Sequence, residues 1–144
     1  PFLDAVQMTN AAVTPASSLP ELYAASDYLS LHIPALPDTI SSINHALLSK
    51  LPTGATVINT ARKEIVNEEE LVRILKDRPD LAYVADVMPD NYQQLAQDFP
   101  GRVYATPKKM GAETAEANDN AACAAARQLV DYFATGNCQY QIKT

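Results

Sequence analysis

Four segments of the sequence place polar or conformationally restricted residues directly after apolar runs. They are His32–Thr39, Asn59–Lys63, Asp86–Asn91 and Thr106–Thr114. Each preceding run is apolar enough to form a buried strand of a parallel sheet. Because ligands bind beyond the carboxyl ends of parallel strands, these four segments are the candidates for a binding site.

Two of the segments contain charged residues suited to holding a small anionic molecule. The guanidinium of Arg62 can form a two-pronged contact with a carboxylate or phosphate, or it can form a surface ion pair with Glu64. Asp86 ends an apolar strand, where a carboxylate is unfavourable unless it is satisfied. It can hold a ligand's amide or amine, or cap the loop that follows.

Lys108 and Lys109 lie between the last apolar run and a long helical segment. A free lysine titrates near ~10.4, and burial beside an arginine lowers that pKa enough for general acid/base chemistry. The alternative is a solvated basic turn. The two prolines of the first segment, Pro34 and Pro37, are equally compatible with a plain structural turn.

Several kinds of site are disfavoured. The four glycines, at positions 54, 101, 111 and 136, form no phosphate-binding G-x-G-x-x-G loop. No G-x-S-x-G hydrolase motif is present. Two distant cysteines and two distant histidines do not make a zinc motif, and we expect free thiols in a reducing cytoplasm. A net charge of -6 disfavours nucleic-acid binding, and no apolar run approaches the ~20 residues of a membrane helix.

The same apolar runs predict the secondary structure. Strands are expected near residues 27–32, 55–60, 81–87 and 102–105, and helices near 18–25, 42–50 and 114–135. Ser17 or Ser18 can cap the first of these helices, and Gly136 stops the last. A further helix begins after Asn67, whose side chain accepts from the helix amides while Glu70 reaches back as in a capping box. This alternation predicts an α/β fold: part of a doubly wound, Rossmann-type parallel sheet with helices on both faces, plus a long C-terminal helix.

Four motifs add a resemblance to these observations. They are Leu31-His32-x-Pro34, the block from Asn59-Thr60-Ala61-Arg62 to the capped helix at Asn67, Asp86-Val87, and Gly111-Ala112-Glu113-Thr114. These motifs resemble those of the NAD-dependent D-2-hydroxyacid dehydrogenases. Within that family the sequence is most similar to the enzymes that oxidise 3-phosphoglycerate. The resemblance covers nearly the whole chain, with matching spacings.

The resemblance implies that this sequence is the C-terminal half of such an enzyme. Residues 1–112 would be the C-terminal part of the nucleotide-binding domain, and residues 113–144 a helix and tail that return to the substrate domain. The glycine-rich loop, the ribose-binding acid and most of the substrate domain would precede Pro1. The family also implies a homodimer, and the isolated fragment is expected to be inactive.

By the same resemblance, Arg62 is the catalytic arginine that grips the substrate carboxylate, and Asp86 contacts the nicotinamide side of NAD. Arg62 and Asp86 are also expected to contact the cofactor. The other residues expected there are Ile33, Pro34, Thr39, Thr60, Ala61 and Gly111.

The sequence departs from the family at the acid/base pair. The position of the usual histidine is Lys109, or Lys108 if the loop is shifted by one residue. The position of its glutamate partner is Asn91, beside Asp90. We therefore expect a lysine-type variant with Lys109 as proton donor and acceptor, Asp90 as a further catalytic residue and an alkaline pH optimum for hydroxyl oxidation.

The implied function is NAD-dependent oxidation of 3-phosphoglycerate, the first step of serine biosynthesis. One alternative is the same chemistry on another D-2-hydroxy acid, such as glycerate or lactate. Another is a non-catalytic NAD-binding sensor similar to the C-terminal-binding-protein corepressors, in which the missing histidine reflects a decayed site.

Overall fold

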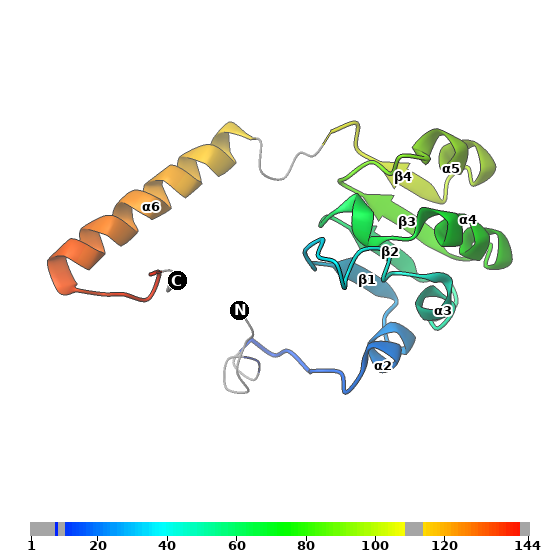
Figure 1. The fold of residues 1–144 in the computed structure, drawn as a ribbon, viewed down its shortest axis with the longest axis horizontal. Coiled ribbons are helices and arrows are strands. Elements are labelled where there is room, and N and C mark those ends of the chain that lie inside the picture. The colour runs from blue at the N-terminus through cyan, green and yellow to red at the C-terminus, as the bar shows by residue number, and fades with distance from the viewer. Residues whose placement is uncertain (1–7, 9–10, 109–113, 142–144) are drawn as a thin grey trace. The chain divides into compact units, whose positions relative to one another are not determined.

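A computed structural model describes residue 8, residues 11–108 and residues 114–141 of the chain. The chain divides into two compact units, Pro1–Pro107 and Lys108–Thr144. The first contains the sheet, and the second contains the long C-terminal helix (Figure 1).

A four-stranded parallel sheet forms the centre of the first unit (Figure 1). Its strands are β1 (Tyr28–Leu31), β2 (Thr56–Asn59), β3 (Ala82–Ala85) and β4 (Val103–Ala105), adjacent in the order β1-β2-β3-β4. All three pairings are parallel. The predicted α/β class and the four predicted strands are confirmed.

The helices follow the sequence pattern with two differences. Those of the first unit are α2 (Leu19–Ala24), α3 (His45–Leu48), the 3-10 turn η1 (Lys63–Ile65), α4 (Glu68–Asp77) and α5 (Tyr92–Asp98). Helix α3 is shorter than the predicted 42–50, because Ile43 is extended and bridges to Val66. Helix α5 was not predicted, since only Leu95 among its residues is buried and the apolar period is weak.

The start of α4 is confirmed at Asn67, but the capping box is not. Asn67 accepts from the backbone N–H of Glu70 at 3.1 Å. Glu70 does not reach back, because the N–H of Asn67 already donates to the carbonyl of Ile43. The carboxylate of Glu70 instead accepts from the backbone N–H of His45 at 2.8 Å and pairs with Arg73. Glu70, which was expected to complete the cap of its own helix, therefore connects α4 to α3.

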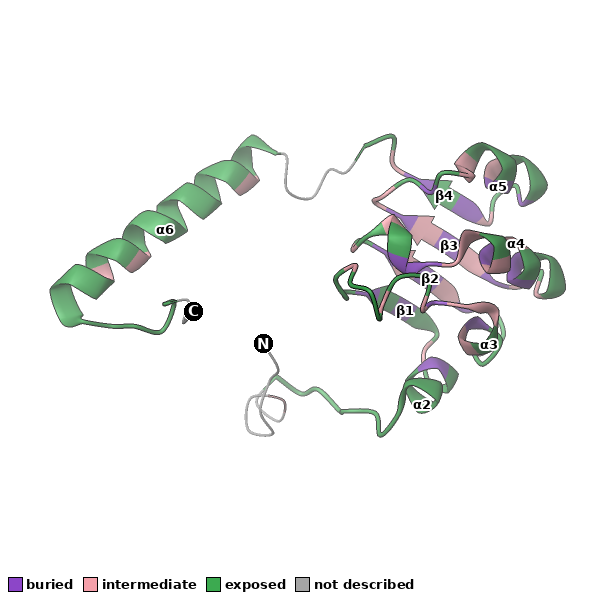
Figure 2. Ribbon diagram, viewed as in Figure 1, coloured by how far each residue is buried: buried purple, intermediate pink, exposed green. Residues whose placement is uncertain are grey.

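The core of the first unit lies on one face of the sheet. Burial alternates along every strand, so that one set of side chains meets the helices and the other is partly or fully exposed (Figure 2). The buried set packs with residues of α2, α3, α4 and α5, the α-helices of this unit for which the structure gives bounds. The reason is topological: strands laid down in sequence order with right-handed crossovers place their connecting helices on the same side. Within the described part of this unit, the helices therefore cover one of the two faces, and the predicted covering of both faces is not found there.

Helix α6 (Ala115–Thr135) makes up most of the described part of the second unit. Thr114 caps its start, and Gly136 ends it in the left-handed conformation, at φ 74°, as the sequence predicts. None of the helix residues is buried, and Cys123 and Cys138 are both exposed free thiols. No helix in the described ranges is long and apolar enough to cross a membrane.

Candidate functional site

The four strands end in register, which brings their following loops into one row. Leu31 is paired with Asn59, Asn59 with Ala85, and Ala85 with Ala105. Neighbouring strands lie about 4.8 Å apart. The carboxyl edge of the sheet therefore collects the four polar segments that the sequence singled out.

Asn59, the last residue of β2, organises the loop that carries Arg62. It is the one polar residue among the described positions that is fully buried, with 0% exposure. Its Nδ2 donates to the backbone carbonyl of Arg62 at 2.9 Å and to the hydroxyl of Tyr83 at 3.2 Å. Its Oδ1 accepts from the N–H of Ala61 at 3.1 Å. Burial raises the pKa of Tyr83 to about 12, so that hydroxyl remains protonated.

Arg62 stands at the edge with an extended backbone and an exposed side chain. One guanidinium nitrogen donates to the carbonyl of Ala61 at 2.8 Å. Among the described residues it has no ion-pair partner, so the alternative of a pair with Glu64 is not found there. Most of its five donors are available to an anionic ligand.

Asp86 follows β3 and is half-buried next to the loop of Arg62. Its backbone N–H donates to the carbonyl of Asn59 at 3.0 Å. The hydroxyl of Thr106, just after β4, lies 3.0 Å from its Oδ1 and 3.2 Å from its backbone carbonyl oxygen, and can donate to either. Strands β2, β3 and β4 are thus connected at their carboxyl ends through Asp86.

The segment after β1 is held by a side-chain hydrogen bond. The hydroxyl of Thr39 donates to the carbonyl of Pro34 at 2.6 Å and accepts from the N–H of Leu36 at 2.8 Å. Ile33 and Pro34 are exposed at the end of the strand. Thr39 therefore shapes this loop from within, and Ile33 and Pro34 are the residues that it leaves open to a ligand.

Asp90 and Asn91 lie in a loop that is tied to the segment after β2. The carboxylate of Asp90 pairs with Lys63 at 2.5 Å, and this hydrogen bond raises the pKa of Lys63. The carboxylate of Glu68 accepts from the backbone N–H groups of Asp90 and Asn91, at 2.9 and 3.2 Å. The structure thus uses the Asp90 carboxylate in an ion pair, and its catalytic role stays a prediction.

The Oδ1 atom of Asn91 is buried without a hydrogen-bond partner in the described part of the chain. Lys109 and Gly111 lie outside the described residues. Lys108 is exposed. Of the cofactor positions in the second loop, Thr60 is exposed and Ala61 is half-buried with its N–H on Asn59. The structure therefore groups the candidate residues of β2 and β3, and the assignment of Lys109 rests on the sequence.

Two residues of this edge, Asn59 and Thr106, begin segments that the sequence singled out but were given no role of their own. Asn59 is an amide at the end of a β-branched, buried run, where an unpaired polar side chain would be costly. Thr106 directly follows the last apolar run. Their partners could not be read from the sequence, because these lie on neighbouring strands.

Comparisons with known proteins agree with this geometry. The family model described as D-isomer specific 2-hydroxyacid dehydrogenase, NAD binding domain, matches residues 2–110. The D-3-phosphoglycerate dehydrogenase of Haemophilus influenzae is 36% identical over 126 residues, which are 83% of this chain and 30% of that protein. The D-lactate dehydrogenase of Lactiplantibacillus plantarum is 37% identical over 82 residues, 57% of this chain and 24% of that protein.

A crystal structure of NAD+-bound 3-phosphoglycerate dehydrogenase from Entamoeba histolytica has the same fold. It matches with a TM-score of 0.74 and 41% sequence identity, over 92% of this chain and 45% of that one. The chain spans less than half the length of each of these three relatives.

Proposed function

Because the chain belongs to the D-isomer specific 2-hydroxyacid dehydrogenase family, we propose that it is part of an NAD-dependent oxidoreductase acting on 3-phosphoglycerate. Residues 1–112 are the C-terminal part of the nucleotide-binding domain, and residues 113–144 return to the substrate domain. The similarity to 3-phosphoglycerate dehydrogenases over most of this chain supports the choice of substrate.

One observation carries the proposal: Arg62 and Asp86 follow adjacent strands that end in register, and most of the Arg62 donors are available. The guanidinium binds the substrate carboxylate and stabilises negative charge on the reacting oxygen. The Asp86 carboxylate accepts a hydrogen bond from the nicotinamide carboxamide. Two groups of opposite charge on neighbouring strands thereby orient an acid and a cofactor toward each other.

These residues fit the nicotinamide end of NAD, which accepts a hydride from C2 of the hydroxy acid when it is bound. A half-buried carboxylate fixed by Thr106 is a suitable acceptor for an amide N–H. Ile33, Pro34, Thr60, Ala61 and Gly111 line the same cofactor, and Thr39 holds the loop that presents Ile33 and Pro34 to it. Since the chain has no glycine-rich phosphate loop, sequence outside it binds the pyrophosphate.

Lys109 accepts the proton of the substrate hydroxyl and returns it in the reverse direction, and Asp90 is a further catalytic residue. A neutral amine is the form that accepts a proton. The assignment of Lys109 rests on its place in the sequence, two residues before Gly111. The cytoplasmic location and the homodimer remain predictions, the latter to be tested by light scattering.

The similarity to D-lactate dehydrogenases favours one alternative, a different D-2-hydroxy acid. The first test is NADH oxidation by the whole protein, at its native length, with phosphohydroxypyruvate, hydroxypyruvate and pyruvate, beside Lys109→Ala. We expect phosphohydroxypyruvate to be the best substrate, and the variant to bind NADH but to lose most of its rate. A better rate with another oxo acid identifies that substrate instead. NADH binding without turnover of any oxo acid supports the sensor.

The pH profile tests the lysine directly. Oxidation of the hydroxy acid needs neutral Lys109, so kcat/KM should rise with pH through the neutral range toward the lysine's pKa. A free lysine has a pKa of ~10.4. Measurement of kcat/KM from neutral to alkaline pH checks this, and a flat profile contradicts it.

A further inference from the structure

Two polar side chains at the carboxyl edge have no place in the reaction as proposed, yet they contact the segments that do. Asn59 is completely buried, and Thr106 is half-buried. Neither side chain is needed for the strand pairing, because backbone groups make it. Their side-chain contacts should therefore explain why polar residues stand there.

Two of the three hydrogen bonds of the Asn59 side chain organise the turn into Arg62. Its Oδ1 holds the N–H of Ala61 at 3.1 Å, and its Nδ2 holds the carbonyl of Arg62 itself at 2.9 Å. The second Nδ2 contact, 3.2 Å from the hydroxyl of Tyr83, anchors the amide to the interior of β3. An apolar residue would leave the two backbone groups of the turn without these partners.

The hydroxyl of Thr106 acts in the same way on the neighbouring strand. It is within hydrogen-bond distance of the Oδ1 of Asp86, at 3.0 Å, and of the carbonyl oxygen of the same residue, at 3.2 Å. The backbone N–H of Asp86 is bound by the carbonyl of Asn59 at 3.0 Å. The carboxylate is thus held from β4 and the main chain from β2.

We infer that Asn59 and Thr106 are positioning residues: Asn59 sets the place of Arg62, and Thr106 sets the direction of the Asp86 carboxylate. This inference rests on the proposed function, in which Arg62 binds the oxo acid and Asp86 binds the cofactor. The two residues act on different ligands, so their variants should separate kinetically.

Removal of the Asn59 amide should damage the substrate side. In Asn59→Ala, kcat/KM for phosphohydroxypyruvate should fall about 100-fold, because displacing a catalytic group such as the Arg62 guanidinium by about 1 Å lowers the rate by that factor. The Kd of NADH should change less than threefold. Tyr83→Phe is the control, since it removes only the anchoring hydroxyl and should keep most of the activity.

Removal of the Thr106 hydroxyl should damage the cofactor side. Thr106→Val has nearly the same shape and no donor, and should raise the Kd of NADH about tenfold, the equivalent of one lost hydrogen bond to a charged group. Thr106→Ser keeps the donor and should restore binding to within about twofold. NADH fluorescence titration measures both and needs no turnover.

A double-mutant comparison distinguishes positioning from simple destabilisation. If Asn59 acts through Arg62, adding Asn59→Ala to Arg62→Ala should lower kcat/KM by less than about threefold more. A loss of nearly 100-fold in that background overturns the role of Asn59, as does Asn59→Ala that folds and keeps full activity. Equal NADH affinities in the two Thr106 variants overturn the role of Thr106.

The proposed function can fail separately. If the native protein turns over no oxo acid, the proposed function and the role of Asn59 both fail, while NADH titration still decides the role of Thr106. If the native protein turns over an oxo acid, the proposed function stands. The positioning roles then fail if Asn59→Ala keeps full activity and the two Thr106 variants bind NADH equally well.

Discussion

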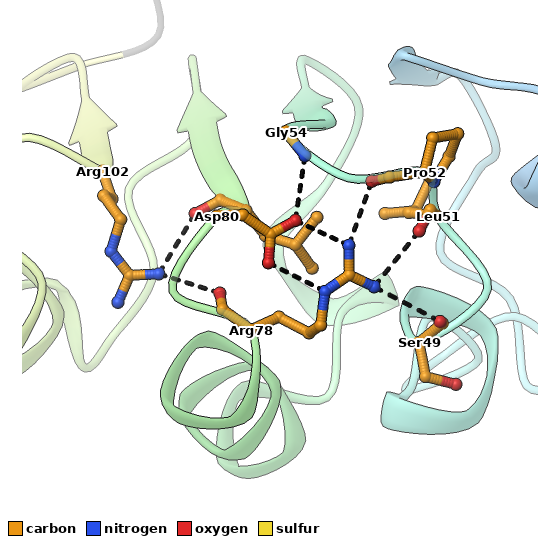
Figure 3. Close-up of polar contacts among 8 residues, drawn as sticks. Ser49, Leu51, Pro52, Gly54, Arg78, Asp80 and Arg102 are labelled. Atoms are coloured by element: carbon orange, nitrogen blue, oxygen red, sulfur yellow. Dashed lines mark hydrogen bonds and ion pairs between the residues drawn. The ribbon is translucent and has the colours of Figure 1, made fainter.

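Arginines have opposite roles at the two ends of the parallel strands. We call the side where the strands begin the amino edge, and the side where they end the carboxyl edge. At the amino edge, Arg78 directs its guanidinium inward, to Asp80 and to the carbonyls of Leu51 and Pro52 (Figure 3). At the carboxyl edge, Arg62 is exposed, and within the described ranges its side chain makes one hydrogen bond, to the carbonyl of Ala61. The guanidinium donors of Arg78 are thus used within the protein, whereas most of those of Arg62 are available to a ligand.

A second arginine strengthens the amino edge. Arg102 donates to the carbonyls of Arg78, Leu81 and Leu75 at 2.8–3.2 Å. Its guanidinium also lies 4.9 Å from the centre of the Phe99 ring. The number of donors satisfied inside the protein therefore separates a structural arginine from one that is available to a ligand, and sequence position alone does not.

The largest effect that follows from this contrast is on activity at the carboxyl edge. Arg62→Ala should lower kcat/KM for the oxo acid by about 10²- to 10³-fold, and Arg62→Lys should recover little because the two-pronged contact is lost. Both should change the free energy of unfolding by less than about 0.5 kcal/mol, as is usual for exposed positions. Steady-state kinetics beside urea unfolding of the same samples checks this, and near-normal kinetics would show that Arg62 does not bind substrate.

The reciprocal change is at the amino edge. Arg78→Met should lower the free energy of unfolding by about 2 kcal/mol, because it removes the guanidinium hydrogen bonds to Asp80 and to the carbonyls of Leu51 and Pro52. The properly folded fraction should keep its KM values. Urea unfolding measures the first quantity and initial rates the second. A stable variant with impaired kinetics would mean that the two edges are not independent.

Acid should weaken the amino edge through Asp80. The Arg78 side chain, followed by the N–H of Gly54, holds the pKa of Asp80 well below its usual range. A carboxyl whose pKa is lowered by folding adds stability above its unfolded pKa of ~3.9 and loses it as pH falls toward the folded pKa. Asp80→Asn should therefore show a smaller loss of stability below pH ~4 than the native protein. Unfolding curves in urea from pH 5 to pH 2 test this, and equal pH dependences would contradict it.

The smallest effect is expected for a conservative change at the second amino-edge arginine. Arg102→Lys keeps the charge but loses the planar set of donors that reaches three carbonyls, and should cost about 1 kcal/mol of unfolding free energy. Activity should not change. Arg62→Lys is the matched comparison: it should lower kcat/KM and leave the free energy of unfolding almost unchanged, whereas Arg102→Lys should do the opposite.

The sequence predicted features within one segment better than contacts between segments that are distant in the sequence. The four strands, the caps at Ser18 and Asn67, and the end of α6 at Gly136 depend on short segments and were found at or within a few residues of the expected positions. Helix α5 was missed because it buries Leu95 alone and its pattern is weak. Glu70 was assigned to its own helix, but its carboxylate bonds to α3.

The sequence by itself determined that polar groups follow buried strands and that Arg62 and Asp86 are at strand ends. The order and register of the strands, which bring these two ends side by side, belong to the tertiary structure. So does the distinction between Arg62 and Arg78, since both are arginines near strand ends. Hydrogen bonds to distant carbonyls satisfy one guanidinium and not the other, because only the packed sheet brings those carbonyls within reach.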